Sequence, residues 1–167
     1  MSIDVADFEL PNVSTGPEQY RLSERAADTD LRAVVLLFQR DYHCGKCRKQ
    51  VQAVADRYDE FTDRQVEVVS VLPEPASQTA KWHESYDLPY PLLADESKQV
   101  SDDFDQPTRF GALGSLHDLV GRMPEAVVLD VRSGDPNVHH VHKGSGPSDR
   151  PSIDDLLDII DDLDSAS

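Results

Sequence analysis

Two cysteines, Cys44 and Cys47, are the only thiols in the chain, and two residues separate them. At the start of a helix, positions i and i+3 lie on one face, so the two sulfurs can form a disulfide with little movement of the backbone. A C-x-x-C between a strand and a helix is typical of thiol–disulfide redox sites. The pair therefore predicts a dithiol that is reversibly oxidised.

The elements on either side of the cysteines fit this interpretation. The apolar run at 33–38 predicts a buried strand directly before them. After them, apolar residues recur at spacings of three and four, which predicts an amphipathic helix over 48–61 with a stripe of Val51, Val54, Ala55, Tyr58 and Phe61. We expect the first turn of this helix to contain Gly45, Lys46 and Cys47. A helix N-terminus beside the sulfurs favours the thiolate, because its free N–H groups and dipole lower the pKa of a thiol.

The charge around the cysteines is opposite in sign to that of the whole chain. The sequence holds 16 basic and 32 acidic residues, a net charge of −16. Residues 39–50 nevertheless contain only one acid, Asp41, beside a cluster of Arg40, His43, Lys46, Arg48 and Lys49. Positive neighbours stabilise a thiolate. We therefore expect Lys46 and Arg48, which flank Cys47, to increase its reactivity.

Length and composition restrict the class of protein. A chain of 167 residues suits one domain, 1–167. No apolar stretch could cross a bilayer and no signal sequence begins the chain, so we expect a cytoplasmic protein, in which a permanent structural disulfide is unusual. With 23 Asp and 5 Lys, the composition resembles that of proteins from salt-loving microbes. The negative charge argues against binding to nucleic acid or anionic membranes.

The rest of the chain alternates between strands and helices. We expect an edge strand or hairpin at 7–12, a polar connector at 23–30, and strands at 34–38, 66–72, 91–94, 126–131 and 138–142, the last two forming an antiparallel pair. Helices are expected at 77–86, from about 97, and at 152–163, while the interrupted segment 104–121 favours only a short helix at 113–120. Parallel strands first and antiparallel strands last predict an α/β fold, a central mixed sheet flanked by helices with an N-terminal extension.

Three stretches carry a resemblance to a known family: Asp7-Phe8-Glu9-Leu10-Pro11, the strand 66–71 with the segment 86–95, and the segment 146–152 before the last helix. In this order they resemble the peroxiredoxin-like AhpC/TSA (redoxin) family of the thioredoxin-fold superfamily. The resemblance implies a thioredoxin-like fold and a thiol-dependent antioxidant oxidoreductase. It also implies peroxide or a protein disulfide as substrate, a thioredoxin-like or small-thiol reductant, and no cofactor or metal.

The chain departs from the peroxiredoxin signature Pro-x-x-x-Thr-x-x-Cys. Counted from Phe38, the resemblance puts the peroxide-attacking position at Cys47, the Thr position at Cys44 and the Pro position at Arg40. Counted as a thioredoxin-type motif, Cys44 is instead the exposed nucleophile and Cys47 the resolving thiol, with His43 where thioredoxins usually have Trp. We place Cys44 first, because the first sulfur of such a motif is usually the exposed one.

A second position distinguishes peroxiredoxins from thioredoxins. Six residues before Asp130, peroxiredoxins have a peroxide-binding Arg and thioredoxins a cis-proline against the disulfide, whereas this chain has Pro124 preceded by Met123. A cis bond there would leave the backbone of Met123 free to pair with an extended substrate. Arg122 is near enough to reach the site as well. Alternatively, Pro124 merely begins an edge strand.

Other arrangements of the same residues favour different functions less strongly. His139, His140 and His142 lie on an expected strand, where alternation puts His139 on one face and the other two on the opposite face, so no zinc site is predicted. The rival function is a non-catalytic redox sensor or a metallochaperone that holds Cu(I) or Zn²⁺ on the cysteine pair with His43. Two thiols and one imidazole leave a zinc shell incomplete, which favours the enzyme. The sequence leaves open the physiological oxidant, the reductant and a homodimer.

Overall fold

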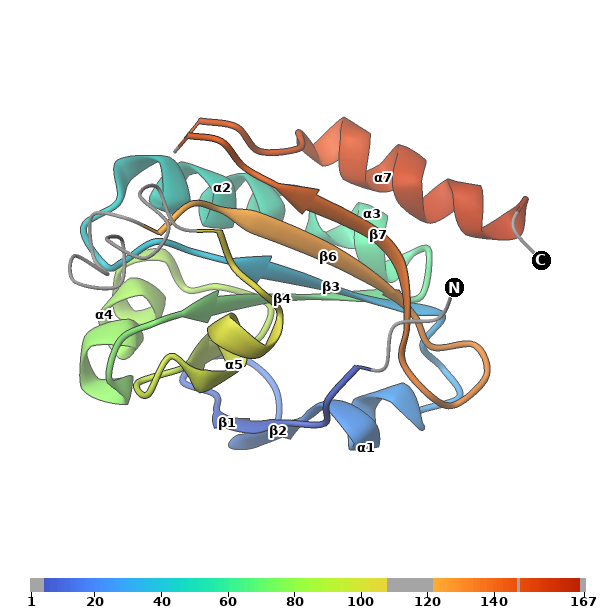
Figure 1. Ribbon diagram of the computed structural model, residues 1–167, viewed down its shortest axis with the longest axis horizontal. Helices are drawn as coiled ribbons and strands as arrows, with labels where there is room; N and C mark the ends of the chain where they lie inside the picture. Colours follow the sequence, from blue (N-terminus) through green and yellow to red (C-terminus); the bar gives the residue numbers. More distant parts are fainter. Residues whose placement is uncertain (1–4, 108–121, 147, 166–167) are drawn as a thin grey trace.

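The computed structural model describes residues 5–107, 122–146 and 148–165. Within these residues a five-stranded mixed sheet has the order β5–β4–β3–β6–β7 (Figure 1). Its strands are β3 (Ala33–Phe38), β4 (Val66–Leu72), β5 (Leu92–Ala94), β6 (Glu125–Asp130) and β7 (Asn137–Lys143). Strands β3, β4 and β5 are parallel, whereas β6 runs antiparallel to β3 and β7 antiparallel to β6. The predicted order of parallel strands before antiparallel ones is confirmed.

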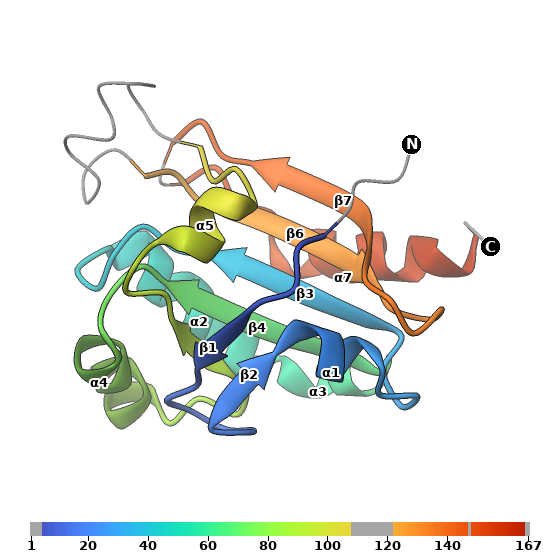
Figure 2. The same ribbon diagram turned by 60° about the horizontal axis from the view of Figure 1, so that its bottom comes forward.

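Helices and a small hairpin cover the two faces of this sheet. One face carries α2 (Gly45–Asp56), α3 (Tyr58–Thr62), α4 (Ala76–Tyr86) and α7 (Ile153–Asp161), which is followed by the 3₁₀ turn η2 (Asp162–Asp164). The other face carries the antiparallel pair β1 (Glu9–Pro11) and β2 (Gln19–Arg21), with α1 (Leu22–Ala26) and α5 (Gln99–Asp103). Figure 2 shows β1, β2 and α1 on the side of the sheet away from α7.

The central strand β3 fixes the position of the cysteines. All six of its residues are buried, because β4 and β6 pair with its two edges and both faces are covered. Val35 and Leu37 face the core beneath α2, whereas Val34, Leu36 and Phe38 face the core beneath β1 and β2. Strand β3 ends at Phe38, so the turn that leads to Cys44 begins directly at the carboxyl edge of a rigid strand.

Two helices differ from their predicted bounds. The helix predicted to run to Phe61, with Gly45, Lys46 and Cys47 in its first turn, begins at Gly45 as expected, but a break at Arg57 (φ −118°, ψ 21°) divides it into α2 and α3. The polar connector predicted at 23–30 contains α1, whose Leu22 and Ala26 are buried against the second core. Five residues with one apolar pair at i and i+4 are too few to give a periodic signal, so tertiary packing decides this helix.

The last helix follows the sequence closely. Ser152 caps α7 by accepting from the backbone N–H of Asp155, whose side chain accepts from the N–H of Ser152 in return. The helix buries its apolar stripe against the sheet: Ile153, Leu156, Leu157 and Ile160. The short helix predicted at 113–120 lies outside the described residues. Among the residues that are described, none of the helices has the length and apolar character needed to cross a membrane.

Candidate redox site

Cys44 and Cys47 are joined by a disulfide, with their Cα atoms 5.2 Å apart. Cys44 is the N-cap of α2, and its sulfur accepts from the backbone N–H of Cys47 at 3.1 Å. The expected pairing across a helix start is therefore present. The expectation that Cys44 is exposed is wrong, because Cys44 is 1% and Cys47 0% exposed. Exposure does not distinguish the two sulfurs.

Among the described residues, the cation closest to the sulfurs is Arg150, which the sequence did not single out. Its Nη2 lies 3.0 Å from the sulfur of Cys47 and 3.7 Å from that of Cys44. Its Nη1 donates to the side-chain oxygens of Gln39 and Gln50, both at 2.7 Å. Arg150 comes from the loop before α7, more than one hundred residues after the cysteines in the sequence. Only the fold brings them together.

Arg150 keeps its charge although it is largely removed from water. Burial, with the nearby charge of Arg40, lowers the pKa of Arg150 to about 10. At neutral pH the guanidinium is therefore still protonated. The side-chain amide oxygens of Gln39 and Gln50 fix its orientation. A planar fork held in this way is suited to an anionic sulfur, since a charge-assisted hydrogen bond is stronger than a neutral one.

A second donor reaches Cys47 from the backbone. The N–H of Arg40 points at the sulfur of Cys47 with a distance of 3.4 Å. Arg40 occupies the position at which the peroxiredoxin signature has proline, and a proline has no N–H to donate. The substitution therefore adds a backbone donor. Its side chain does not face the sulfur, because its Nε is paired with Asp41 at 2.7 Å.

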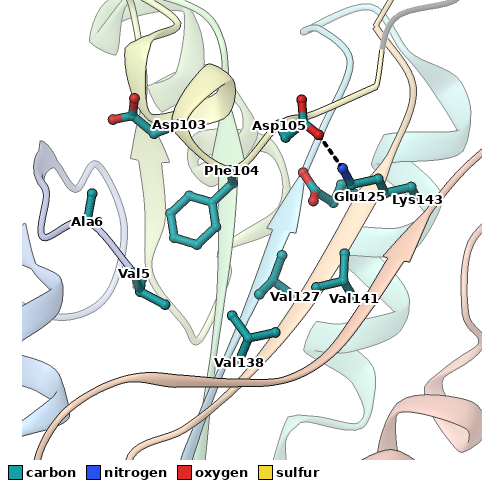
Figure 3. Close-up of a pocket in the computed structure, with 10 residues that line it drawn as sticks. All are labelled: Val5, Ala6, Asp103, Phe104, Asp105, Glu125, Val127, Val138, Val141 and Lys143. Atoms are coloured by element: carbon teal, nitrogen blue, oxygen red, sulfur yellow. Dashed lines mark hydrogen bonds and ion pairs between the residues drawn. The ribbon is translucent and has the colours of Figure 1, made fainter. Parts of the chain in front are cut away.

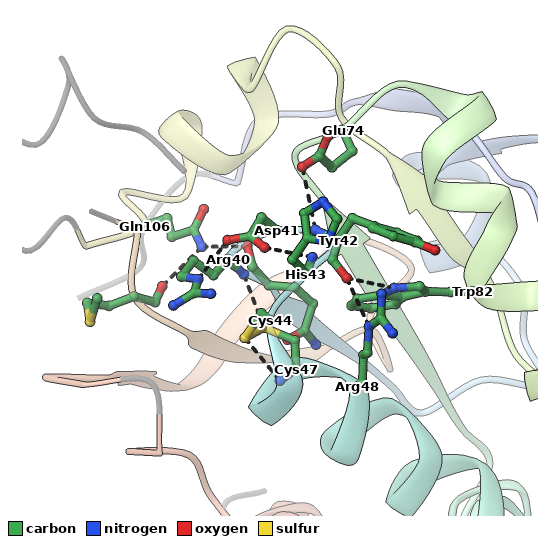
Figure 4. A network of polar contacts seen from close by, with 12 residues as sticks. Arg40, Asp41, Tyr42, His43, Cys44, Cys47, Arg48, Glu74, Trp82 and Gln106 are labelled. Carbon is green, nitrogen blue, oxygen red and sulfur yellow. Dashed lines mark hydrogen bonds and ion pairs between the residues drawn. A yellow bond between two sulfur atoms is a disulfide. The ribbon is translucent and has the colours of Figure 1, made fainter. Parts of the chain in front are cut away.

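The turn between β3 and α2 is held by a compact polar network (Figure 4). The buried carboxylate of Asp41 accepts from the N–H of His43 at 2.7 Å as well as from Arg40. The carbonyl of Tyr42 accepts from Arg48 at 3.0 Å and from Trp82 of α4 at 3.1 Å. These contacts tie the turn to α2 and to α4. They make the approach of the chain to Cys44 rigid.

Arg48 and Lys46 do not hold the sulfurs as predicted. The guanidinium of Arg48 lies over the ring of Tyr42, 4.6 Å from its centre, and points away from the disulfide. Lys46 is exposed on the first turn of α2. The prediction erred because positions that flank a cysteine in a helix point about 100° away from it, whereas the facing loop can reach it directly. Of the cations in the part of the chain that the structure describes, Arg150 lies nearest to the sulfurs.

The Met123–Pro124 bond is trans, since the described residues contain no cis peptide bond. The backbone of Met123 is also occupied. Its N–H donates to the carbonyl of Pro107 at 2.9 Å, and its carbonyl accepts from Gln106 at 3.0 Å. Gln106 in turn donates to the carbonyl of Gln39 at 3.0 Å. The proposed free edge for an extended substrate at Met123 is therefore absent.

In the contacts that the structure describes, Arg122 reaches the site through Gln106. Its Nη1 donates to the side-chain oxygen of Gln106 and its Nη2 to Asp102, both at 3.0 Å. Arg122 is 3% exposed, and its Nε has no hydrogen-bond partner. Its described contacts support the turn at Gln39 from the far side and do not include the sulfurs.

The three histidines of β7 do not form a metal site within the described residues. A bulge opposite Val128 and Leu129 breaks the alternation, so His139 also faces α7, with its Nε2 3.2 Å from the carbonyl of Ile159. The predicted placement of His139 on the opposite face is wrong for this reason. Among the described residues no third ligand joins the cysteines either, since the His43 ring packs edge-on against Tyr42 at 5.0 Å.

A cavity of about 390 Å³ lies on the other face of the sheet (Figure 3). Apolar side chains form most of its wall: Val5, Phe104, Val127, Val138 and Val141. Glu125 of β6 lies among them, 3% exposed, with one carboxyl oxygen that has no partner. Burial raises the pKa of Glu125 to about 7, although Lys143 acts in the opposite direction. The ammonium of Lys143 pairs with Asp105 at 2.6 Å.

Comparison with known proteins identifies the family of this site. Residues 3–131 match the model of the AhpC/TSA family. The chain belongs to the AhpC/TSA family. Both cysteines lie inside the matched residues of this AhpC/TSA chain, whereas Arg150 lies beyond them.

Relatives of the AhpC/TSA chain carry peroxiredoxin names. A chloroplastic peroxiredoxin Q of Suaeda salsa is 34% identical over 110 residues, which are 65% of this chain and 51% of the relative. A putative peroxiredoxin of Mycobacterium tuberculosis is 33% identical over 112 residues, 67% of this chain and 68% of the relative. The chain thus spans about half the length of the chloroplastic relative.

The crystal structure of peroxidoxin BcpB from Mycobacterium tuberculosis has the same fold. It superposes with a TM-score of 0.77 over 97% of this chain and 96% of its own, at 26% identity. The thioredoxin-like α/β fold predicted from the sequence is thereby confirmed.

Proposed function

We propose that this AhpC/TSA chain is a thiol-dependent peroxidase in which Cys47 attacks the peroxide and Cys44 resolves the product. One observation carries the proposal: a charged guanidinium and a backbone N–H converge on the sulfur of Cys47, at 3.0 Å and 3.4 Å. Membership of the AhpC/TSA family and the peroxiredoxin names of its relatives support the reaction class.

The proposed chemistry needs no group beyond the two thiols and a peroxide. The Cys47 thiolate attacks one peroxide oxygen, the O–O bond breaks, and the other oxygen leaves with a proton as water or an alcohol. Cys47 then carries a sulfenic acid. The thiol of Cys44 attacks this sulfur, water leaves, and the observed disulfide forms. Two electrons from an external thiol donor reopen the disulfide.

Cys47 rather than Cys44 is proposed as the nucleophile because its donors stabilise the charged form. The guanidinium of Arg150 is closer to Cys47 than to Cys44, 3.0 Å against 3.7 Å. The argument for Cys44 from exposure has no support, since both residues are buried. The nearest described donor to the sulfur of Cys44, at the N-cap, is the neutral backbone N–H of Cys47 at 3.1 Å, and Arg150 lies farther away at 3.7 Å. A charge-assisted donor favours a thiolate more strongly.

A peroxide is proposed as the oxidant in preference to a protein disulfide. A disulfide-reducing site holds its polypeptide substrate through backbone hydrogen bonds, and Met123, the residue expected to make them, has both backbone groups occupied by Pro107 and Gln106. A small neutral peroxide needs no such edge. The reductant is a thiol donor of either the thioredoxin-like or the small-molecule class. The cytoplasmic location and the homodimer stay predictions.

Single-turnover oxidation of two variants tests the assignment. Reduced Cys44→Ser protein is expected to consume one equivalent of hydrogen peroxide and to hold a sulfenic acid on Cys47 that a dimedone-type reagent labels. Reduced Cys47→Ser protein is expected to leave the peroxide almost untouched. Mass spectrometry of the labelled peptides and thiol titration measure both outcomes. A model disulfide, offered to the same proteins, provides the competing oxidant.

Two results would overturn the proposal. Labelling of Cys44 in the Cys47→Ser protein, with none of Cys47 in its counterpart, would reverse the roles. Rapid oxidation of the wild-type protein by the model disulfide, with no measurable reaction with peroxide, would instead make it a thiol–disulfide oxidoreductase.

A further inference from the structure

A groove of about 280 Å³ lies beside the disulfide, between α2 and the loop that leads into α7. Figure 1 shows both helices on the same face of the sheet. We name it the basic groove; its charged and polar walls are formed by Lys46, Lys49, Gln50, Ser148, Arg150 and Ser152. Arg150 belongs to both places, because one of its nitrogens contacts Cys47 while its side chain lines the groove. The basic groove therefore adjoins the sulfurs.

The basic groove is positive on a strongly negative protein. Lys46 and Lys49 are three residues apart on α2, so their side chains project to the same side of the helix. Neither ammonium is within ion-pair distance of a described carboxylate. No Asp or Glu is among the described residues that line the groove. With a net charge of −16 on the whole chain, three cations around one hollow create a local field that attracts anions.

The size of the basic groove restricts its ligand to a small molecule. Its volume of about 280 Å³ is slightly below the range of small-molecule sites, which is roughly 300–1,000 Å³. An acidic protein partner would meet the negative charge of the rest of the surface. A small anion that fits inside the groove is close to its positive charges and far from most of the negative surface. Charge and size together favour a low-molecular-weight ligand with one or more negative groups.

We propose that the basic groove binds the carboxylate of a small anionic thiol, which reduces the Cys44–Cys47 disulfide. This rests on the proposed function and names the class of its reductant. The ligand thiolate attacks the sulfur of Cys44, the disulfide bond breaks, and Cys47 leaves as a thiolate beside Arg150. A second molecule of the thiol attacks the mixed disulfide, which frees Cys44 and releases the oxidised dimer of the ligand. Stabilising the leaving thiolate makes the first step faster.

Reduction by thiols of different charge tests the proposal. The oxidised protein is mixed with 3-mercaptopropionate, 2-mercaptoethanol or cysteamine, which are anionic, neutral and cationic, and the appearance of protein thiols is followed under pseudo-first-order conditions. Rates are compared per thiolate, because the three thiols differ in pKa. We expect the anionic thiol to react fastest at low salt, with a rate that saturates as its concentration rises. At about 1 M salt, where charges are screened over about 3 Å, the preference should nearly vanish.

Two matched double variants separate the groove from the general field of the protein. Lys46→Gln with Lys49→Gln removes two positive charges from the groove, and we expect about a fivefold slower reaction with 3-mercaptopropionate and little change with 2-mercaptoethanol. Lys81→Gln with Arg132→Gln removes the same charge outside the groove: Lys81 lies over the Tyr42 ring and Arg132 pairs with Asp130. This control should change the anionic rate by less than twofold.

The outcomes distinguish this proposal from the peroxidase assignment. Equal losses in both double variants, or the same rate per thiolate for all three thiols, would overturn the groove as a binding site. Reaction of the wild-type protein with hydrogen peroxide is measured separately, without any thiol present. A protein that prefers the anionic thiol but does not react with peroxide would support thiol binding in the basic groove and contradict the proposed peroxidase activity. A protein that reacts with peroxide but shows no preference for the anionic thiol would support the peroxidase activity and contradict thiol binding in the basic groove.

Discussion

Two ionisable side chains, the half-buried Arg150 and the buried Glu125, lie on opposite faces of the same sheet and differ in the hydrogen-bond partners that surround them. Arg150 has amide oxygens and sulfurs as hydrogen-bond partners and keeps its charge at neutral pH, with a pKa lowered to about 10. Glu125 has one oxygen without a partner, and burial raises its pKa to about 7. A buried charge is retained where donors or acceptors replace water, and is neutralised where they do not.

The contrast between Arg150 and Glu125 indicates which of the two charged groups can stabilise a reacting anion. The cation at the disulfide is preorganised, since Gln39 and Gln50 hold it before any thiolate forms. Preorganised charge of this kind acts on a reacting group without the cost of reorientation. The carboxyl of Glu125 instead lies among mostly apolar side chains, and of the two charged groups that act on it, Lys143 favours the carboxylate whereas Asp105 disfavours it. Three predictions test this contrast.

The largest expected effect is that of Arg150→Gln. Loss of the guanidinium removes the charged donor to Cys47, so we expect single-turnover reaction with hydrogen peroxide at pH 7 to slow on the order of 100-fold. The pH of half-maximal alkylation by iodoacetamide should rise by about 1 to 2 units in the same protein. Stopped-flow kinetics and alkylation profiles measure the two effects.

Two further variants control for misfolding at this position. Arg150→Lys keeps the charge without the planar fork and should recover part of the rate. Arg132→Gln, at the far end of β6, should react like the wild-type protein. A peroxide rate for Arg150→Gln within twofold of wild type, with native circular dichroism, would show that the guanidinium of Arg150 is not needed.

The second effect concerns stability at the other face of the sheet. Because the pKa of Glu125 is raised from 4.5 to about 7 in the folded protein, the stability it contributes is fully present below pH 4.5 and is lost as the pH rises through about 7. We expect the free energy of unfolding of the wild-type protein to fall by on the order of 2 kcal/mol over this pH range because of Glu125, and Glu125→Gln to abolish this fall. Urea unfolding at several pH values measures it.

The difference between wild type and variant isolates Glu125 from the other carboxyls. A hydrogen bond from Arg132 lowers the pKa of Asp130. The contribution of such a carboxyl to the free energy of unfolding decreases as the pH falls, which is opposite to the contribution of Glu125. Glu84→Gln, which removes an exposed carboxyl, serves as the control. Parallel stability curves for wild type and Glu125→Gln between pH 4.5 and 8 would contradict the raised pKa.

The smallest effect is expected from Lys46→Gln combined with Arg48→Gln. Lys46 is exposed and Arg48 lies over Tyr42, so the pH of half-maximal alkylation should change by less than about 0.3 units. Loss of the contact with the Tyr42 ring should lower the free energy of unfolding by about 0.5–1 kcal/mol. If the pH of half-maximal alkylation shifts as much as in Arg150→Gln, then Lys46 and Arg48 are the residues that stabilise the thiolate, and the assignment of this role to Arg150 is wrong.

The elements around the cysteines could be predicted because their signals are local. The six apolar residues of β3 and the stripe of α2 have the periods of a buried strand and an amphipathic helix. The Ser152 cap of α7 is likewise a pattern of neighbouring residues. Helix α1 and the break at Arg57 could not be predicted, since packing against other elements decides them.

The sequence by itself determined the disulfide pair, its place at a helix start and the succession of parallel strands before antiparallel ones, because spacing and periodicity act between residues close along the chain. Only the tertiary structure decided which cation meets the sulfurs, that both sulfurs are buried, and that the backbone of Met123 is occupied. Arg150 stands 103 residues after Cys47 in a loop without periodicity. Its contact exists because α7 packs against the face that carries α2, and no local pattern encodes that distance.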